Sequence, residues 1–270
     1  MIIAGTTFGL ADLALMLSVT FLAVGVAYLP SPRAKSICFS IPLPFSMSFL
    51  STGQALDATA SIGILATWAF PWITWVLYKK KAWAILLAEL AALLFFCVVS
   101  AVVPLYVARI GPVETFAFWI SWGIMLPICL AMMAWLPPKQ EAHHKSPLPV
   151  PLKTLLIFVI VFFVVLAKSH IRGFMVAFPY VTCFAVYEGR HSLYTLARRM
   201  PSFILSIMPA LLLCRLLPPH IGFFGALAVS WAFYIPSLIL IDRFYTRRDH
   251  AVLHEPPGKR DEEIEPPLGE

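Results

Sequence analysis

A few ionisable side chains of this 270-residue chain lie inside apolar segments, where a charge is costly. Placing Asp, Lys or Arg at the centre of a membrane helix costs about 2.5–3.5 kcal/mol on insertion scales, so such residues are functional candidates. Glu89 is the deepest acid, because it lies eight residues beyond Lys81, about 12 Å along a helix. Glu89 either takes part in a proton or cation relay, or forms a structural hydrogen bond between helices.

Two adjacent arginines, Arg198 and Arg199, precede another apolar segment. Their long side chains can extend to the membrane surface, which makes them structural. Alternatively, one of them turns inward to bind an anionic group or a carboxylate such as Glu188, since a planar guanidinium binds carboxylate or phosphate through two parallel hydrogen bonds. Both interpretations stay open at this stage.

Two further acids lie near predicted helix starts. Asp57 follows Gly53 and Gln54, and we expect it in the first turn of a helix, stabilised by the helix N-terminus, with a polar contact to a solute as the alternative. Asp12 lies close to the start of the first apolar segment, where we expect water to reach it.

Prolines interrupt several apolar segments, and we single out Pro44, Pro71, Pro179 and Pro209 as helix breaks. Inside a membrane, backbone groups freed by a break need protein or a water-filled cavity to satisfy them. Transporters place broken helices at corresponding positions of two repeats to line a substrate site. Prolines are also common in membrane helices generally, so a purely structural role is equally open.

Sequence motifs for catalysis or metal binding are absent. The chain has no Gly-x-Ser-x-Gly, no His-Glu-x-x-His and no phosphate-binding loop. His143 and His144 have no partners at ligand spacing, and the five cysteines show no Cys-x-x-Cys pair. We therefore expect no enzymatic activity, no metal and no cofactor.

Composition predicts a membrane protein that must position these side chains on helices. The chain is 60% hydrophobic and 13% charged, whereas soluble domains are about 45–50% apolar and about 25% charged. Apolar runs long enough to cross a bilayer recur, and the predicted class is an all-α, polytopic helical membrane protein with about nine spans. The predicted spans are residues 8–29, 37–50, 56–78, 82–107, 116–136, 154–167, 173–187, 194–217 and 221–241.

Two stretches of the chain echo one another. Residues 39–53 and 174–189 each contain a Pro followed by an aromatic residue, and each closes on a Gly. With the N-terminus outside, most basic residues of the loops are cytoplasmic, which satisfies the positive-inside bias. We thus predict two four-helix units in inverted repeat, at 1–108 and 154–243, separated by a linker helix and cytoplasmic loop at 109–153. Residues 244–270 are predicted to be a disordered cytoplasmic tail.

The second unit carries a series of short motifs: His170-Ile171-Arg172-Gly173-Phe174, Ala177-Phe178-Pro179-Tyr180, Phe184-Ala185, and then Gly189, Ser192, Leu193, Leu196 and Arg198. In this order they resemble the GlpM family of small four-span bacterial inner-membrane proteins. The resemblance covers residues 152–241, and more faintly 11–99, where Ile41-Pro42-Leu43-Pro44 replaces the Phe-Pro pair and the third span has no Arg. It implies a bacterial inner membrane and an envelope-related role, linked to exopolysaccharide, and no reaction.

Two functions are consistent with this pattern. The first is a transporter or permease-like protein for a small or anionic solute, with Glu89 and Arg198 or Arg199 as polar contacts of a midplane cavity. The second is a non-catalytic accessory or assembly component of envelope or exopolysaccharide biosynthesis. The expected partners are the lipid bilayer, a small-molecule or ion substrate, and a second copy or an envelope protein. Nucleic acid is not expected, because the net charge of +6 comes from basic residues at segment ends, where they set orientation.

Overall fold

The computed structural model describes residues 2–3, 6–7, 9–28, 42–52, 56–110, 113–137, 149–166 and 172–253. Helices dominate this part of the chain, and its only strands are the two-residue antiparallel pair β1 (Ile2–Ile3) and β2 (Thr6–Thr7). In chain order the helical elements are α1 (Leu10–Tyr28), α3 (Leu43–Thr52), α4 (Ala58–Trp75), the π-helix η1 (Val76–Lys80), α5 (Ile85–Ile110), α6 (Val113–Trp135), α7 (Val150–Leu166), the 3₁₀ helix η2 (Arg172–Met175), α9 (Tyr180–Glu188), α10 (Leu193–Leu216) and α11 (Pro218–Leu253).

Among the described residues, five helices are long and apolar enough to cross a membrane: α4 with η1, α5, α6, α10 and α11. Large apolar side chains on α5, α6 and α11, such as Leu94, Ile124 and Phe233, point away from the protein interior, as lipid-facing side chains do. This composition and length indicate a helical membrane protein, which agrees with the predicted class.

The predicted number of spans depends on two short helices. α3 has 10 residues and α9 has 9, about 15 and 14 Å of helix, whereas the hydrocarbon core is about 30 Å thick. Neither helix crosses it alone, so the predicted count of about nine spans stays a prediction. The predicted linker and the first echoed stretch fall partly on residues 138–148 and 29–41, which lie outside the described residues.

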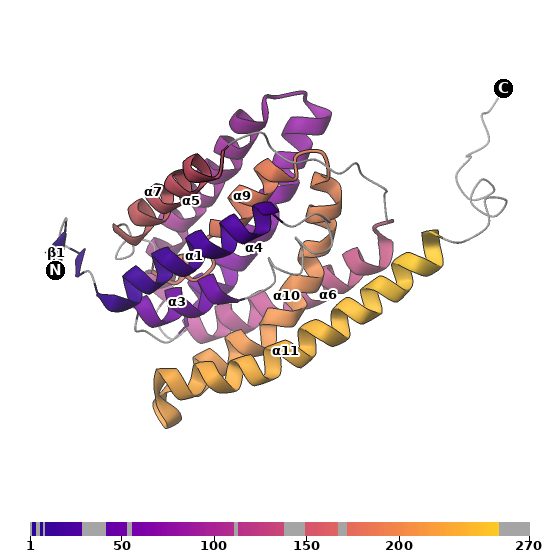
Figure 1. Cartoon of the computed structure of the whole chain (residues 1–270). Coiled ribbons are helices and arrows are strands. Elements are labelled where there is room, and N and C mark those ends of the chain that lie inside the picture. Colours follow the sequence, from indigo (N-terminus) through magenta and orange to yellow (C-terminus); the bar gives the residue numbers. More distant parts are fainter. Residues whose placement is uncertain are drawn as a thin grey trace, which may run out of the picture.

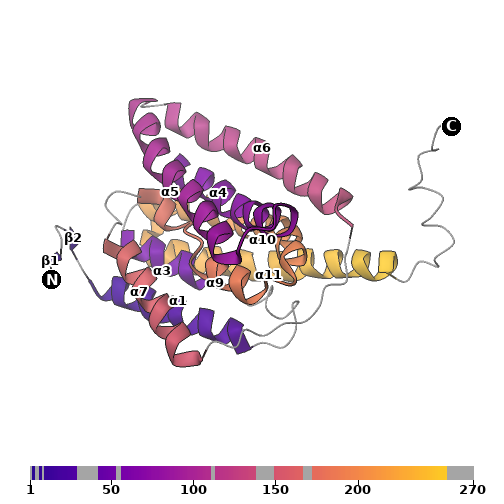
Figure 2. The same ribbon diagram turned by 90° about the horizontal axis from the view of Figure 1, so that it is seen from above.

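The helices pack as two antiparallel pairs around shorter elements. α4 packs against α5, α10 packs against α11, and α4 also contacts α10. α1 packs against α3, α7 and α9. Figure 1 shows α11 running along one edge of the molecule, and Figure 2 shows α5 and α6 on the side opposite α1 and α7. The elements between them, α3, α9, α10 and η2, surround the interior.

One glycine allows α4 to approach the interrupted segment closely. A Cβ on Gly63 would lie 2.9 Å from the Ala177 Cβ and 3.1 Å from Cδ1 of Phe174, so no larger residue fits there without displacement. This contact holds η2 and the residues after it against the middle of α4.

The four singled-out prolines have two different roles. Pro44 is the second residue of α3 and Pro179 is the N-cap of α9, positions that suit a residue without an N–H. α4 and α10 continue through Pro71 and Pro209, so the prediction of breaks at these two positions is wrong.

The last helix is longer than the sequence pattern predicts. α11 continues to Leu253, so the predicted disorder from residue 244 is wrong for residues 244–253. The rest of that predicted tail, 254–270, lies outside the described residues. The extra turns of α11 carry charged side chains that pair with α10, which explains why a polar sequence remains helical here.

Candidate functional site

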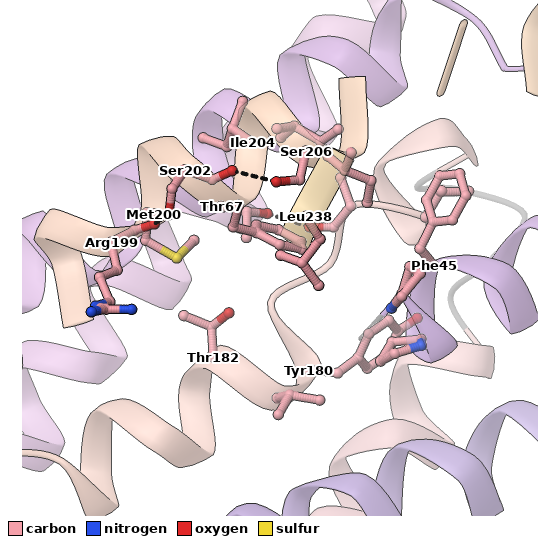
Figure 3. Close-up of a pocket in the computed structure, with 18 of the residues that line it drawn as sticks. Phe45, Thr67, Tyr180, Thr182, Arg199, Met200, Ser202, Ile204, Ser206 and Leu238 are labelled. Atoms are coloured by element: carbon pink, nitrogen blue, oxygen red, sulfur yellow. Dashed lines mark hydrogen bonds between the residues drawn. The ribbon is translucent and has the colours of Figure 1, made fainter. Parts of the chain in front are cut away.

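A cavity of about 90 Å³ lies between the start of α3, the middle of α4, residues 176–182, the first half of α10 and the last half of α11 (Figure 3). Its wall is mostly apolar, with Phe45, Ile64 and Leu238 among the lining residues. Its polar side chains come from different elements and are Thr67, Tyr180, Thr182, Arg199, Ser202, Ser206 and Asp242.

Both proline-containing segments border this cavity. Pro42 and Pro44 contribute from the start of α3, and Ala177 and Phe178 contribute from the non-helical stretch before α9. The Thr67 hydroxyl donates a hydrogen bond to the carbonyl of Ala177, which satisfies part of the backbone that the break exposes. An irregular backbone at membrane depth is tolerated where it lines such a cavity.

Arg199 supplies the positive charge of the cavity. Its Nη1 donates to Asp242 Oδ1 at 3.1 Å, and both residues line the cavity. The two are packed in the protein interior, with side-chain exposures of 12% and 22%. Ser202 donates to the backbone carbonyl of Arg199 at 2.7 Å, so its hydroxyl braces the turn that carries this arginine.

Arg198 has a different environment. Its Nη1 and Nη2 donate to the two carboxylate oxygens of Asp249 at 2.9 and 2.6 Å, and its Nε donates to the carbonyl of Leu136 at 2.9 Å. Tyr245 lies beneath the guanidinium, 4.6 Å from ring centroid to Cζ, and donates its hydroxyl to the Arg198 carbonyl. Arg198 therefore ties α10 to α11 and to the end of α6, and its carboxylate partner is Asp249, not the predicted Glu188.

Glu89 does not line the cavity, so the expectation that it shares a site with Arg199 is wrong. It lies on α5, which packs against α9. Its Oε1 is buried without a hydrogen-bond partner among the described residues. Glu188 is buried at the end of α9 and is also absent from the cavity wall.

The two acids near helix starts are both structural. Asp57 is the N-cap of α4 and accepts a hydrogen bond from the Thr59 amide at 3.0 Å, which confirms the predicted position. Asp12 is only 2% exposed, so the expectation that water reaches it is wrong. It accepts from the Gly9 amide at 2.8 Å and from the Ser51 hydroxyl, and thereby ties α1 to α3.

Sequence reasoning missed the acids of α11. Tyr245 and Asp249 follow Asp242 by three and seven residues, a spacing that places all three on one face of a helix. This spacing opposite two adjacent arginines was a detectable signal. It was overlooked because the charged sequence after Arg243 was interpreted as a tail.

No family model, curated protein or solved structure matches this chain. Among the described residues there is also no group of three or more His, Cys, Asp or Glu that could hold a metal ion. The argument for function therefore depends on the cavity and on the side chains that line it.

Proposed function

We propose that this protein is a permease-like transporter of a small solute, and that the cavity containing Arg199 is its solute site. The observation that supports this most strongly is the position of the cavity. It lies where two interrupted segments meet, and its polar groups come from α4, α9, α10 and α11. Transporters use this arrangement to expose backbone and side-chain ligands at membrane depth.

The packing of the helices supports two equivalent units, at 1–108 and 154–243. The pair α4–α5 corresponds to α10–α11, and the contact of α5 with α9 corresponds to the contact of α11 with α3. α1 packs on α7, and α4 packs on α10, as corresponding elements on either side of an axis would. The proposal includes inverted repeats in a bacterial inner membrane, of the GlpM type that the second unit resembles.

Transport is tested by measuring flux in proteoliposomes that contain the purified protein, with protein-free vesicles as background. A panel of radiolabelled small carboxylates, inorganic anions, amines and polyols covers the solute classes that fit. We expect saturable flux of at least one of them. Arg199→Gln and the isosteric Thr182→Val should each lower it by about tenfold or more, since a lost hydrogen bond to a charged group corresponds to about 1.5–3 kcal/mol.

Arg190→Gln is the matched control, because Arg190 is also an arginine of the second unit but does not line the cavity. It should transport like the wild type. Absence of flux across the whole panel by a correctly inserted protein would contradict transport and favour the accessory role in envelope or exopolysaccharide biosynthesis. Equal flux for the wild type and the three variants would contradict the assignment of the cavity as the solute site.

A further inference from the structure

We infer that the solute of this cavity is a small monoanion, of about the size of acetate, whose acidic group binds Arg199 in place of Asp242. This inference rests on the proposed function, because it takes the cavity to be the solute site. Three observations carry it: the size of the cavity, the unequal use of the two neighbouring arginines, and the position of Thr182.

The cavity limits the solute to a few heavy atoms. Its volume of about 90 Å³ is smaller than the cavity of about 150 Å³ that holds benzene in another protein. A carboxylate with one to three further heavy atoms fits this space. Sugars, nucleotides and long acyl chains are too large without an expansion of the site.

The guanidinium of Arg199 uses few of its N–H donors on protein acceptors. An arginine offers five N–H donors in a planar fork, but within the described residues Arg199 donates one hydrogen bond, from Nη1 to Asp242. Its Nη2 is 3.9 Å from Asp249 Oδ2, beyond hydrogen-bond distance. Arg198, next in the chain, uses Nε, Nη1 and Nη2 on protein acceptors. Only the arginine that lines the cavity can form a bidentate pair with a solute carboxylate.

Thr182 offers a second polar contact across the cavity. It is buried on α9 and lines the cavity. Figure 3 shows its side chain directed into the cavity, opposite the side that carries Arg199 and Met200. Phe45 and Tyr180 line the other end, where their rings can contact the short apolar part of the solute. The charged group of the cavity and Thr182 thus lie together at one end, and the two aromatic rings lie at the other.

Asp242 acts as an internal stand-in for the solute. A largely buried guanidinium is stabilised by a carboxylate partner, because an isolated buried charge is strongly disfavoured, and Asp242 is that partner in this structure. A solute carboxylate that binds Arg199 therefore competes with Asp242. Removing the charge of Asp242 should strengthen anion binding, whereas it would abolish binding of a cation that used Asp242 as its ligand. Whether removing the charge of Asp242 strengthens or abolishes binding therefore distinguishes an anionic solute from a cationic one.

Saturation-transfer-difference NMR tests this directly with acetate, acetamide and acetamidinium, which share one shape and carry charges of −1, 0 and +1. All three are present in one sample with the purified protein in detergent. We expect transfer to the acetate methyl group only. Asp242→Asn should lower the Kd of acetate by about tenfold, Arg199→Lys should raise it because the fork is lost, and Arg199→Gln should abolish transfer.

Arg190→Gln serves as the charge-matched control and should bind like the wild type. The inference would be overturned if acetamidinium or acetamide bound in preference to acetate, or if Asp242→Asn weakened acetate binding in a protein with an unchanged melting temperature. The proposed function would fail separately. In that case acetate would still bind, and the variants would change its Kd as predicted, but proteoliposomes would show no flux of any solute.

Discussion

At the scale of single residues, the neighbours Arg198 and Arg199 have different environments: Arg198 pairs with Asp249, and Arg199 lines the cavity. Consecutive residues of an α-helix point about 100° apart, so Arg198 faces α6 and the end of α11 while Arg199 faces the cavity. The sequence identified the pair as a candidate but could not separate its members. Their carboxylate partners lie 51 and 43 residues later in the chain, and only the packing of α10 on α11 brings them together.

Arg198 and Asp249 should be coupled in stability. Arg198→Ala leaves a buried carboxylate without its partner, so we expect a loss of about 3–5 kcal/mol in the free energy of unfolding. Asp249→Ala should cost a similar amount, and the double variant should lose clearly less than the sum, because each change removes the same interaction. Denaturant unfolding of the four proteins in detergent checks this cycle. Additive losses would show that the two residues do not interact.

At the scale of elements, two of the four prolines predicted to break helices lie at helix starts, and the other two lie inside continuous helices. The Pro–aromatic echo marked the starts of α3 and α9, where Pro44 and Pro179 indeed stand. The separate prediction of helix breaks at Pro71 and Pro209 failed, because a helix packed on neighbours can continue through a proline whose freed carbonyl finds other partners. The role of Gly63 could not be predicted either, since the residue it contacts, Ala177, lies over a hundred positions away.

Gly63 should tolerate no side chain. Its missing Cβ leaves room for Ala177 and Phe174, so Gly63→Val should overpack the contact between α4 and η2 and destabilise the protein by about 1–3 kcal/mol. Gly123→Val in α6 is the matched control, because a Cβ there has no neighbour within 4 Å. Thermal unfolding in detergent compares the two variants. Equal melting temperatures for Gly63→Val and the wild type would refute the close contact.

At the scale of the whole molecule, composition alone predicted the helical membrane class, and five long apolar helices agree with it. The number of spans does not follow from composition, because α3 and α9 are too short to cross alone and apolar content does not distinguish a half-span from a full one. The full lining of the cavity could not be predicted, because five separate parts of the chain build its wall.

Orientation is the prediction that belongs to this scale. The lysines at the end of η1 and the arginines of the last turns of α11 should face the cytoplasm, which places the N-terminus outside and the C-terminus inside. A fluorescent reporter that folds only in the cytoplasm should therefore be bright when fused to the C-terminus, and a periplasm-active phosphatase should be inactive there. The reverse result at this one fusion point would invert the topology.

The position of Asp249 near the end of α11 also constrains how the protein is made. Synthesis delivers the two arginines of α10 to the membrane first, and both compensating acids follow only when most of α11 has left the ribosome. Until then Arg198 and Arg199 lack these carboxylate partners, and charged side chains are costly in lipid. We therefore expect the two helices to enter the bilayer as one hairpin, late in translation. A nascent chain stalled before residue 242 should leave α10 accessible from the cytoplasm.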